Sequence, residues 1–233
     1  QNSLIPQHRT LRLTVEQAQG GCGLLCEDSP ELADLLLAIR NAGPDVERIE
    51  LTVRADGMPL AHIEELRGAI ARTPKPVHVY LDDGSLPSLY LAAAADRIFI
   101  APGRSLQPGT YGQNHLFYRG LLQNLDVRVD AAKYGELAPV DESLTGEGFS
   151  VAVREHVQNL VQADWAEAWE SMERERELPA DLRRTFREGV FLPEYAVDHG
   201  LADEVKTPPL PQGESLIERL LPPDLEDEDT EEL

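Results

Sequence analysis

Residues 76–103 read PVHVYLDDGSLPSLYLAAAADRIFIAPG, and this stretch decides the fold. Apolar residues alternate in VHVYL (77–81), which is typical of a β-strand, and place His78 on the opposite side of the sheet from the core. The turn DDGSLPS and an alanine-rich helix follow, and RIFI (97–100) is a second strand. A strand, a helix and a second strand in so short a stretch predict parallel pairing.

The same alternation extends to both sides of this stretch. Further strands are predicted at 11–15, 48–54 and 126–133, and further helices at 32–39, 63–70 and 115–125. Alternating strands and helices specify parallel strands joined by right-handed crossovers. The sequence therefore predicts an α/β fold of repeated βα units with a mostly parallel sheet, in which strands 49–53 and 77–81 are neighbours.

The chain changes character at Ser150. Apolar residues at helical spacing predict one long helix. The apolar residues on one side of it, which include Trp165 and Trp169, are predicted to lie in the core rather than in an interface. A shorter helix begins near Pro179. The segment EGVFLPEYAVDHGLADEV (188–205) predicts a turn, a small helix and an edge strand.

Composition limits the possible functions. The 233 residues carry 21 Lys+Arg against 42 Asp+Glu, a net charge of −21, which argues against binding nucleic acid or an anionic membrane surface. No apolar run reaches the roughly 18 residues of a spanning helix. We expect an N-terminal strand and glycine-rich loop (1–28), a main domain (29–206), and a proline-rich linker with an acidic tail (207–233). The tail, with DLEDEDTEEL at its end, reads as a solvated terminus.

The chain lacks the common nucleotide-binding and hydrolase motifs, and Cys22 and Cys26 have no second ligand pair at metal-binding spacing. Whether the two thiols pair is open. Two loops lie where parallel α/β folds place their sites: Asp56–Gly57 after one strand, and GSLPS (84–88) after the next. Their backbone N–H groups suit an oxyanion or a peptide carbonyl, but ordinary βα turns look the same, and that interpretation is preferred.

Four segments, in order, resemble the signal peptide peptidase A family of serine proteases, which share the ClpP/crotonase superfold. They are DVERIELTVRADGMP (45–59), YLAAAADRI (90–98), HLFYRGLLQNLDVRVDAAKYGEL (115–137) and EGVFLPEYAVDHGLADEV (188–205). The resemblance covers about residues 30–206. It implies a ClpP/crotonase-like α/β domain, a serine-lysine dyad, no cofactor and no metal.

The chain departs from this family at the residues that carry the chemistry. The nucleophilic serine corresponds to Leu86, the following Gly-Gly pair to Pro87 and Ser88, and the general-base lysine to Ala138. The oxyanion Gly-Gly corresponds to Gly57–Met58, so half of it is lost. Neither leucine nor alanine can attack a carbonyl or accept a proton.

Three explanations remain open. In double-length members of the family the N-terminal copy lacks the serine, which fits Leu86, and Ala138 is then a natural or engineered loss of lysine. Alternatively the chain is a pseudoprotease that binds peptides without cutting them. The third explanation uses Ser85 or Ser88 as nucleophile with Lys133 as base, but Lys133 is five residues from the matching position and an odd offset reverses the strand face.

Two further classes stand beside the protease. A crotonase-type acyl-CoA enzyme needs acidic residues on these turns, for which Asp56, Asp82 and Asp83 are candidates. A non-catalytic assembly subunit is the other. The resemblance implies a peptide substrate such as a signal peptide. It implies as partner either further copies of the chain, in a homo-oligomer, or a sister domain that carries the serine. It also implies a place at the extracytoplasmic side of a membrane. The chain itself is expected to be soluble.

Overall fold

Five parallel strands form one sheet in a computed structural model of the chain, in the order β1-β2-β3-β4-β5. They are β1 (Arg9–Glu16), β2 (Val46–Arg54), β3 (Val77–Leu81), β4 (Arg97–Ile100) and β5 (Glu204–Val205). The structure describes residues 9–16, 32–107, 112, 115–131, 139–187 and 189–209. Ile49 of β2 lies opposite Val77 of β3, so the predicted neighbourhood of these two strands is confirmed.

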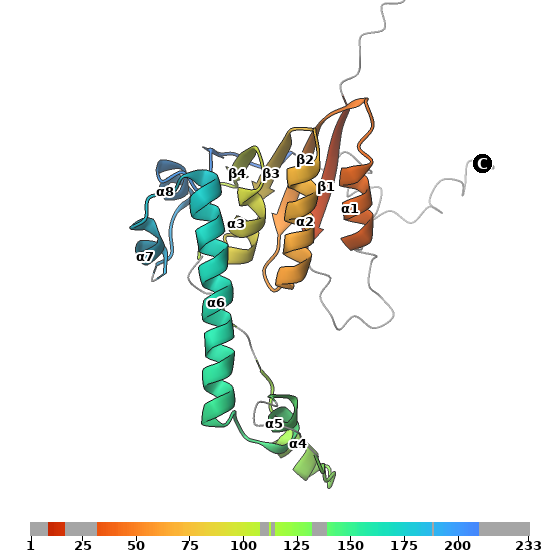
Figure 1. Cartoon of the computed structure of the whole chain (residues 1–233), viewed down its shortest axis with the longest axis vertical. Helices are drawn as coiled ribbons and strands as arrows, with labels where there is room; N and C mark the ends of the chain where they lie inside the picture. The colour runs from red at the N-terminus through yellow and green to blue at the C-terminus, as the bar shows by residue number, and fades with distance from the viewer. Residues whose placement is uncertain are drawn as a thin grey trace, which may run out of the picture.

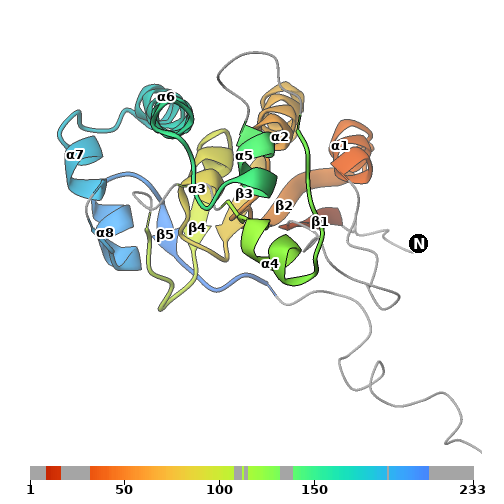
Figure 2. The ribbon, with the colours of Figure 1, turned by 90° about the horizontal axis from the view of Figure 1, so that it is seen from below.

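The described residues form eight helices, of which the first three and one end of the sixth cover one face of the sheet. They are α1 (Leu32–Arg40), α2 (Leu60–Arg72), α3 (Leu86–Ala93), α4 (Arg119–Asn124), α5 (Pro139–Thr145), α6 (Val151–Arg176), α7 (Leu182–Phe186) and α8 (Pro193–Asp198). Figures 1 and 2 show α1, α2, α3 and one end of α6 side by side in a layer above the strands. The predicted α/β class, with βα units, a parallel sheet and a long C-terminal helix, is confirmed.

The alternation within each strand separates the two faces of the sheet. Leu51, Val79 and Ile98 point toward the helices and are almost fully buried in the core. Tyr80 and Phe99, one residue further along their strands, lie on the opposite face. His78 lies on that face as well, next to Phe99, as its position in the sequence predicts.

Helix α6 begins where Ser150 accepts a hydrogen bond from the backbone N–H of Val153, at 3.4 Å. Its C-terminal half packs on α3 and buries Trp169 and Met172 completely, so the predicted core role of its apolar side is confirmed for this half. Its N-terminal half extends away from the sheet, toward the end of the molecule where α4 and α5 lie, as Figure 1 shows. We call residues 115–131 and 139–160 the arm.

The prediction of a strand at 126–133 is wrong for the part that the structure describes. Residues 126–131 form no strand, and Asp126 adopts a left-handed backbone conformation with φ of 53°. Val127 is 46% exposed, because these alternating residues have no neighbouring strand to pair with. The fifth strand is instead β5, the predicted edge strand, which pairs with β4.

Several element boundaries also differ from the prediction. Helix α3 begins at Leu86 rather than at Ser88, because Ser85 caps it and Pro87 fits its first turn. Helix α4 is shorter than 115–125, and α5 was not predicted at all. Cys22, Cys26, Lys133 and Ala138 lie outside the described residues.

A search of the described helices for one long and apolar enough to cross a membrane finds none.

Candidate functional site

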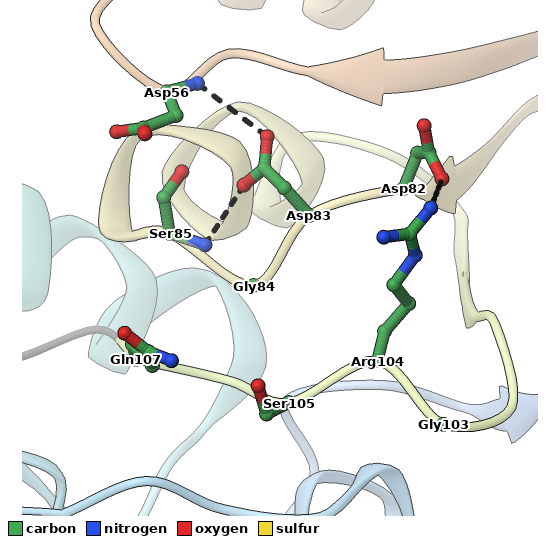
Figure 3. Close-up of a pocket in the computed structure, with 9 residues that line it drawn as sticks. All are labelled: Asp56, Asp82, Asp83, Gly84, Ser85, Gly103, Arg104, Ser105 and Gln107. Atoms are coloured by element: carbon green, nitrogen blue, oxygen red, sulfur yellow. Dashed lines mark hydrogen bonds and ion pairs between the residues drawn. The ribbon is translucent and has the colours of Figure 1, made fainter.

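Three segments meet at the carboxyl ends of the central strands, where parallel α/β sheets place ligands. They are the loop after β2, the turn between β3 and α3, and the segment after β4. A cleft of about 340 Å³ lies between them. Its lining, drawn in Figure 3, consists of Asp56, Asp82, Asp83, Gly84, Ser85, Gly103, Arg104, Ser105 and Gln107.

Asp83 organises the turn. One carboxylate oxygen accepts a hydrogen bond from the backbone N–H of Ser85 at 2.8 Å. The other accepts one from the Ser88 hydroxyl at 2.8 Å and one from the backbone N–H of Asp56 at 3.4 Å. A carboxylate immediately before a helix also interacts favourably with the positive end of the helix dipole. Asp83 therefore joins the loop after β2 to the start of α3.

Ser88 is fully buried and its hydroxyl is committed to structure. It accepts a hydrogen bond from the backbone N–H of Ala55 at 2.7 Å while donating to Asp83. The half-buried Ser85 lines the cleft, caps α3, and has its hydroxyl 3.2 Å from that of Ser88. Among the described residues, neither hydroxyl hydrogen-bonds to a lysine or histidine, the usual bases that activate a serine.

Leu86, which the sequence resemblance predicts to stand at the nucleophile position, is the first residue of α3 and belongs to the hydrophobic core at 3% exposure. Pro87 is buried beside it. The side chain of Leu86 is therefore packed inside the domain and is absent from the cleft lining. Ala138 lies outside the described residues, so its assignment to the position of the general-base lysine stays a prediction.

The predicted oxyanion segment lies at the same end of the sheet. Gly57 has φ of 79°, a left-handed conformation that favours glycine, and is exposed at the tip of the loop after β2. Met58 is half-buried against the core, and its backbone N–H donates to the carbonyl of Ala55 at 3.0 Å. Because this turn uses the Met58 amide, that N–H is not directed to a substrate oxygen.

Ion pairs close one side of the cleft. Asp82 lies between Arg54 of β2 and Arg104 of the segment after β4, and the Arg104 guanidinium is 2.6 Å from its carboxylate. The hydrogen bond from Arg54 to Asp82 raises the pKa of the Arg54 guanidinium. Both arginines are about half exposed, so each pair contributes only about 0–1 kcal/mol to stability. Their main effect is to fix the wall of the cleft.

The segment Ser105–Gln107 forms the opposite wall, and the sequence pattern missed it. The Gln107 N–H donates to the Gly84 carbonyl at 2.8 Å, and Leu106 exchanges two backbone hydrogen bonds with Phe191. A Cβ atom at Gly84 would lie 2.2 Å from the Ser105 carbonyl oxygen. The glycine in DDGS was the only signal in the sequence for this close backbone approach.

Replacing Gly84 with alanine is expected to push this wall away and to cost about 1–3 kcal/mol of the free energy of unfolding, as overpacking does. The Gln107 amide should then exchange its proton faster. Denaturant unfolding and amide hydrogen exchange measure the two effects. Gly43→Ala is the control, because nothing lies within 4 Å of its added Cβ. Equal stability of the two variants would contradict the prediction.

The three aspartates of the cleft differ in their environments. Asp83 is held by three hydrogen bonds, Asp82 by two arginines, and the Asp56 side chain is exposed at the rim. In the part of the chain that the structure describes, no group of three His, Cys, Asp or Glu residues is arranged to hold a metal ion. The described lining of the cleft thus combines hydroxyls and carboxylates with the guanidinium of Arg104, which is paired with Asp82.

Comparisons with known proteins agree with the resemblance seen in the sequence. The model of "Peptidase family S49" matches residues 69–208, more than half of the chain. No curated protein matches.

Solved structures also match, at low sequence identity. A mutant of the "1510-N membrane-bound stomatin-specific protease" is 16% identical, with 84% of this chain and 77% of that one covered and a TM-score of 0.46. A mutant of ClpP1 from Listeria monocytogenes is 11% identical, with 86% and 92% covered and a TM-score of 0.49. An enoyl-CoA hydratase/isomerase family protein from Silicibacter pomeroyi is 15% identical, with 85% and 72% covered and a TM-score of 0.42. With TM-scores below 0.5, these three similarities add no argument to the family match.

Proposed function

This chain belongs to peptidase family S49, and from that premise we propose that it is a catalytically incomplete serine protease domain of the signal peptide peptidase type. The observation that carries the proposal is the turn at the start of α3. Leu86 fills the nucleophile position and is buried in the core, while the two nearby hydroxyls are held by hydrogen bonds to Asp83 and to backbone amides. The turn is kept, but its nucleophile is lost.

The cleft is proposed to bind an extended peptide. It is open at the carboxyl ends of β2, β3 and β4, and its lining includes hydroxyl and carboxylate groups, which can hydrogen-bond to the main chain of a peptide. The signal-peptide substrate, and with it a place at the extracytoplasmic side of a membrane, comes from the family resemblance.

We expect the chain by itself to leave a fluorogenic peptide uncut, because a serine protease that loses its nucleophile and its base keeps only the weak catalysis of binding and oxyanion stabilisation. A fluorophosphonate probe should leave the chain unlabelled for the same reason. The control is Ser85→Ala, which should behave like the unmodified chain in both assays. Hydrolysis that is blocked by the probe and abolished in Ser85→Ala would instead identify Ser85 as a nucleophile.

The half-enzyme version of the proposal has its own test. Four samples are compared: the chain, Ala138→Lys, and each of these mixed with a serine-bearing S49 domain. We expect hydrolysis only in the mixture that contains Ala138→Lys, since a dyad needs both the lysine and a serine. Inactivity of all four samples would favour a pseudoprotease that binds peptides, and it would remove the role assigned to position 138.

The arm supports a proposed assembly with a second copy or a sister domain. Eight of the eleven large hydrophobic side chains that are exposed among the described residues lie on it: Leu116, Tyr118, Leu121, Leu125, Val127, Leu144, Val151 and Leu160. Such a concentration of exposed apolar surface marks interaction sites. Figure 1 shows that the arm projects from the sheet, where another subunit can reach it.

Replacing Leu121 and Leu125 with aspartate is expected to shift the chain to a smaller species, because the two charges would have to be buried in the interface. Light scattering after size exclusion measures the mass. The matched control is Val190→Asp with Leu192→Asp, two residues of similar exposure outside the arm. A monomeric unmodified chain at tens of micromolar, or equal masses of both double variants, would contradict an interface on the arm.

A further inference from the structure

The face of the sheet opposite the helices carries a cationic patch. We call it the open face, because Figure 2 shows the layer of α1, α2 and α3 on the other side of the sheet. Strand register places its residues side by side: Arg12 next to Glu50, Glu50 next to His78, His78 next to Arg97, and Tyr80 next to Phe99.

An aromatic pair lies at the centre of the open face. Tyr80 and Phe99 stack with their ring centroids 4.8 Å apart, and both are at most 4% exposed. Cations lie over the Phe99 ring: the Arg97 guanidinium is 5.2 Å from its centroid and the Lys206 ammonium 5.0 Å. The ring faces attract both cations, which therefore stay over the sheet.

The charges around this pair do not balance. Arg12 and Arg48 share the buried Glu50, at 2.8 and 3.0 Å. Arg97 makes a loose 3.7 Å pair with Glu204, in which both side chains are half exposed. With Lys206, four cations thus face three carboxylates, those of Glu50, Glu204 and Asp96, although the chain as a whole has a net charge of −21.

His78 lies among these charged groups. Burial is the first cause that lowers the pKa of its imidazole, and the charges of Arg48 and Arg97 lower it further. Glu50 and Asp96 act in the opposite direction and weaken this effect. The open face therefore favours an anion.

The chain carries a strongly acidic segment after β5, within reach of the open face. After β5 the chain passes Lys206 and its described part ends at Pro209, on the side of the sheet away from α1–α3 (Figure 2). Residues 224–233 follow, with seven acids in ten residues. The 14 residues between, extended, span up to about 46 Å, whereas four strand spacings cover about 19 Å.

We propose that the acidic segment 224–233 docks on the open face of its own chain, with its carboxylates on Arg97, Lys206 and the exposed parts of Arg12 and Arg48. This inference is independent of the proposed protease function, because the open face lies on the other side of the sheet from Leu86 and the core. A tether that starts beside the patch raises the local concentration of the segment above that of any free anion.

A spin label on the full chain tests this docking. Glu232→Cys, in a background of Cys22→Ser and Cys26→Ser, carries a nitroxide, and amide signals are recorded with the label oxidised and reduced. We expect the signals of Tyr80 and Phe99 to lose most of their intensity at low salt. They should recover at 1 M salt, where the screening length falls from about 10 Å at 0.1 M to about 3 Å.

Two double variants separate the patch from general charge effects. Arg97→Gln with Lys206→Gln should restore the signals at low salt, whereas Arg40→Gln with Arg72→Gln, at the ends of α1 and α2, should leave them broadened. All four side chains are exposed, so we expect these variants to fold. The comparison of low and high salt tests the docking on the unsubstituted patch as well. Unbroadened signals, or equal broadening in both variants, would overturn the proposal. Broadening that passes from a spin-labelled chain to an unlabelled one would overturn it in favour of contact between copies.

Discussion

Replacing Arg67 with methionine is expected to lower the free energy of unfolding by about 3 kcal/mol, the cost of breaking a buried ion pair. Arg67 belongs to α2, and its side chain is only 8% exposed. Its guanidinium lies 3.9 Å from the centroid of the Tyr90 ring in α3 and donates to the Tyr90 carbonyl. It also donates to Ser171 at 3.2 Å and to Glu175 at 2.6 Å, both in α6. One side chain thus joins three helices.

The same contacts connect the arm to the candidate site. Helix α3 begins at the cleft and α6 continues into the arm, so the loss of Arg67 should loosen both. The Tyr90 hydroxyl, which donates to Glu64, is part of the same cluster, and burial together with this hydrogen bond raises the pKa of Tyr90. Removing Arg67 leaves these polar groups with fewer partners in a buried place.

Denaturant unfolding measures the change, and Arg72→Met is the matched control. Arg72 lies on the same helix but is exposed, so its replacement should change stability by less than about 0.5 kcal/mol. A loss for Arg67→Met no larger than that of the control would show that the cluster contributes nothing.

Trp169→Ala is expected to cost about 3–5 kcal/mol, the largest effect of any single substitution in α6. Trp169 is fully buried, and its ring lies 5.8 Å from that of Trp165 and 5.9 Å from that of Phe186 in α7. Its removal would leave a cavity between α6, α7 and the sheet layer. The packing of α7, and with it the segment that carries Phe191, depends on this contact.

A second variant separates the ring from its N–H group. The indole nitrogen of Trp169 is buried without a hydrogen-bond partner among the described residues. Trp169→Phe should therefore cost clearly less than Trp169→Ala, because it keeps most of the apolar volume and removes an unsatisfied donor. Leu160→Ala, at a half-exposed position of the same helix, is the control and should change stability little. Equal losses for Trp169→Phe and Trp169→Ala would contradict this account.

The candidate site could be located, but not interpreted, from the sequence. The loops at Asp56–Gly57 and at 84–88 follow two strands whose alternation is plain, so their place at one end of the sheet was predictable. That Ser88 turns inward to Ala55 and Asp83, while Ser85 lines the cleft, depends on the start of α3. Ser85 caps that helix, and the burial of the Ser88 hydroxyl follows from its contacts with the loop after β2, which is distant in sequence.

By itself, the sequence determined the helices and strands that a periodic pattern of neighbouring apolar residues specifies. Strands β1 to β4 alternate over a buried face, α2 and α6 repeat their apolar residues at helical spacing, and both kinds of pattern are periodic and local. Only the tertiary structure decided between 126–131 and 204–205 as the fifth strand. Both stretches alternate, but a strand exists only where a neighbour accepts its hydrogen bonds, and β4 offers its free edge to Glu204–Val205. The wall of the cleft at 105–107 arose in the same way, from backbone contacts with Gly84 and Phe191 that are distant in sequence.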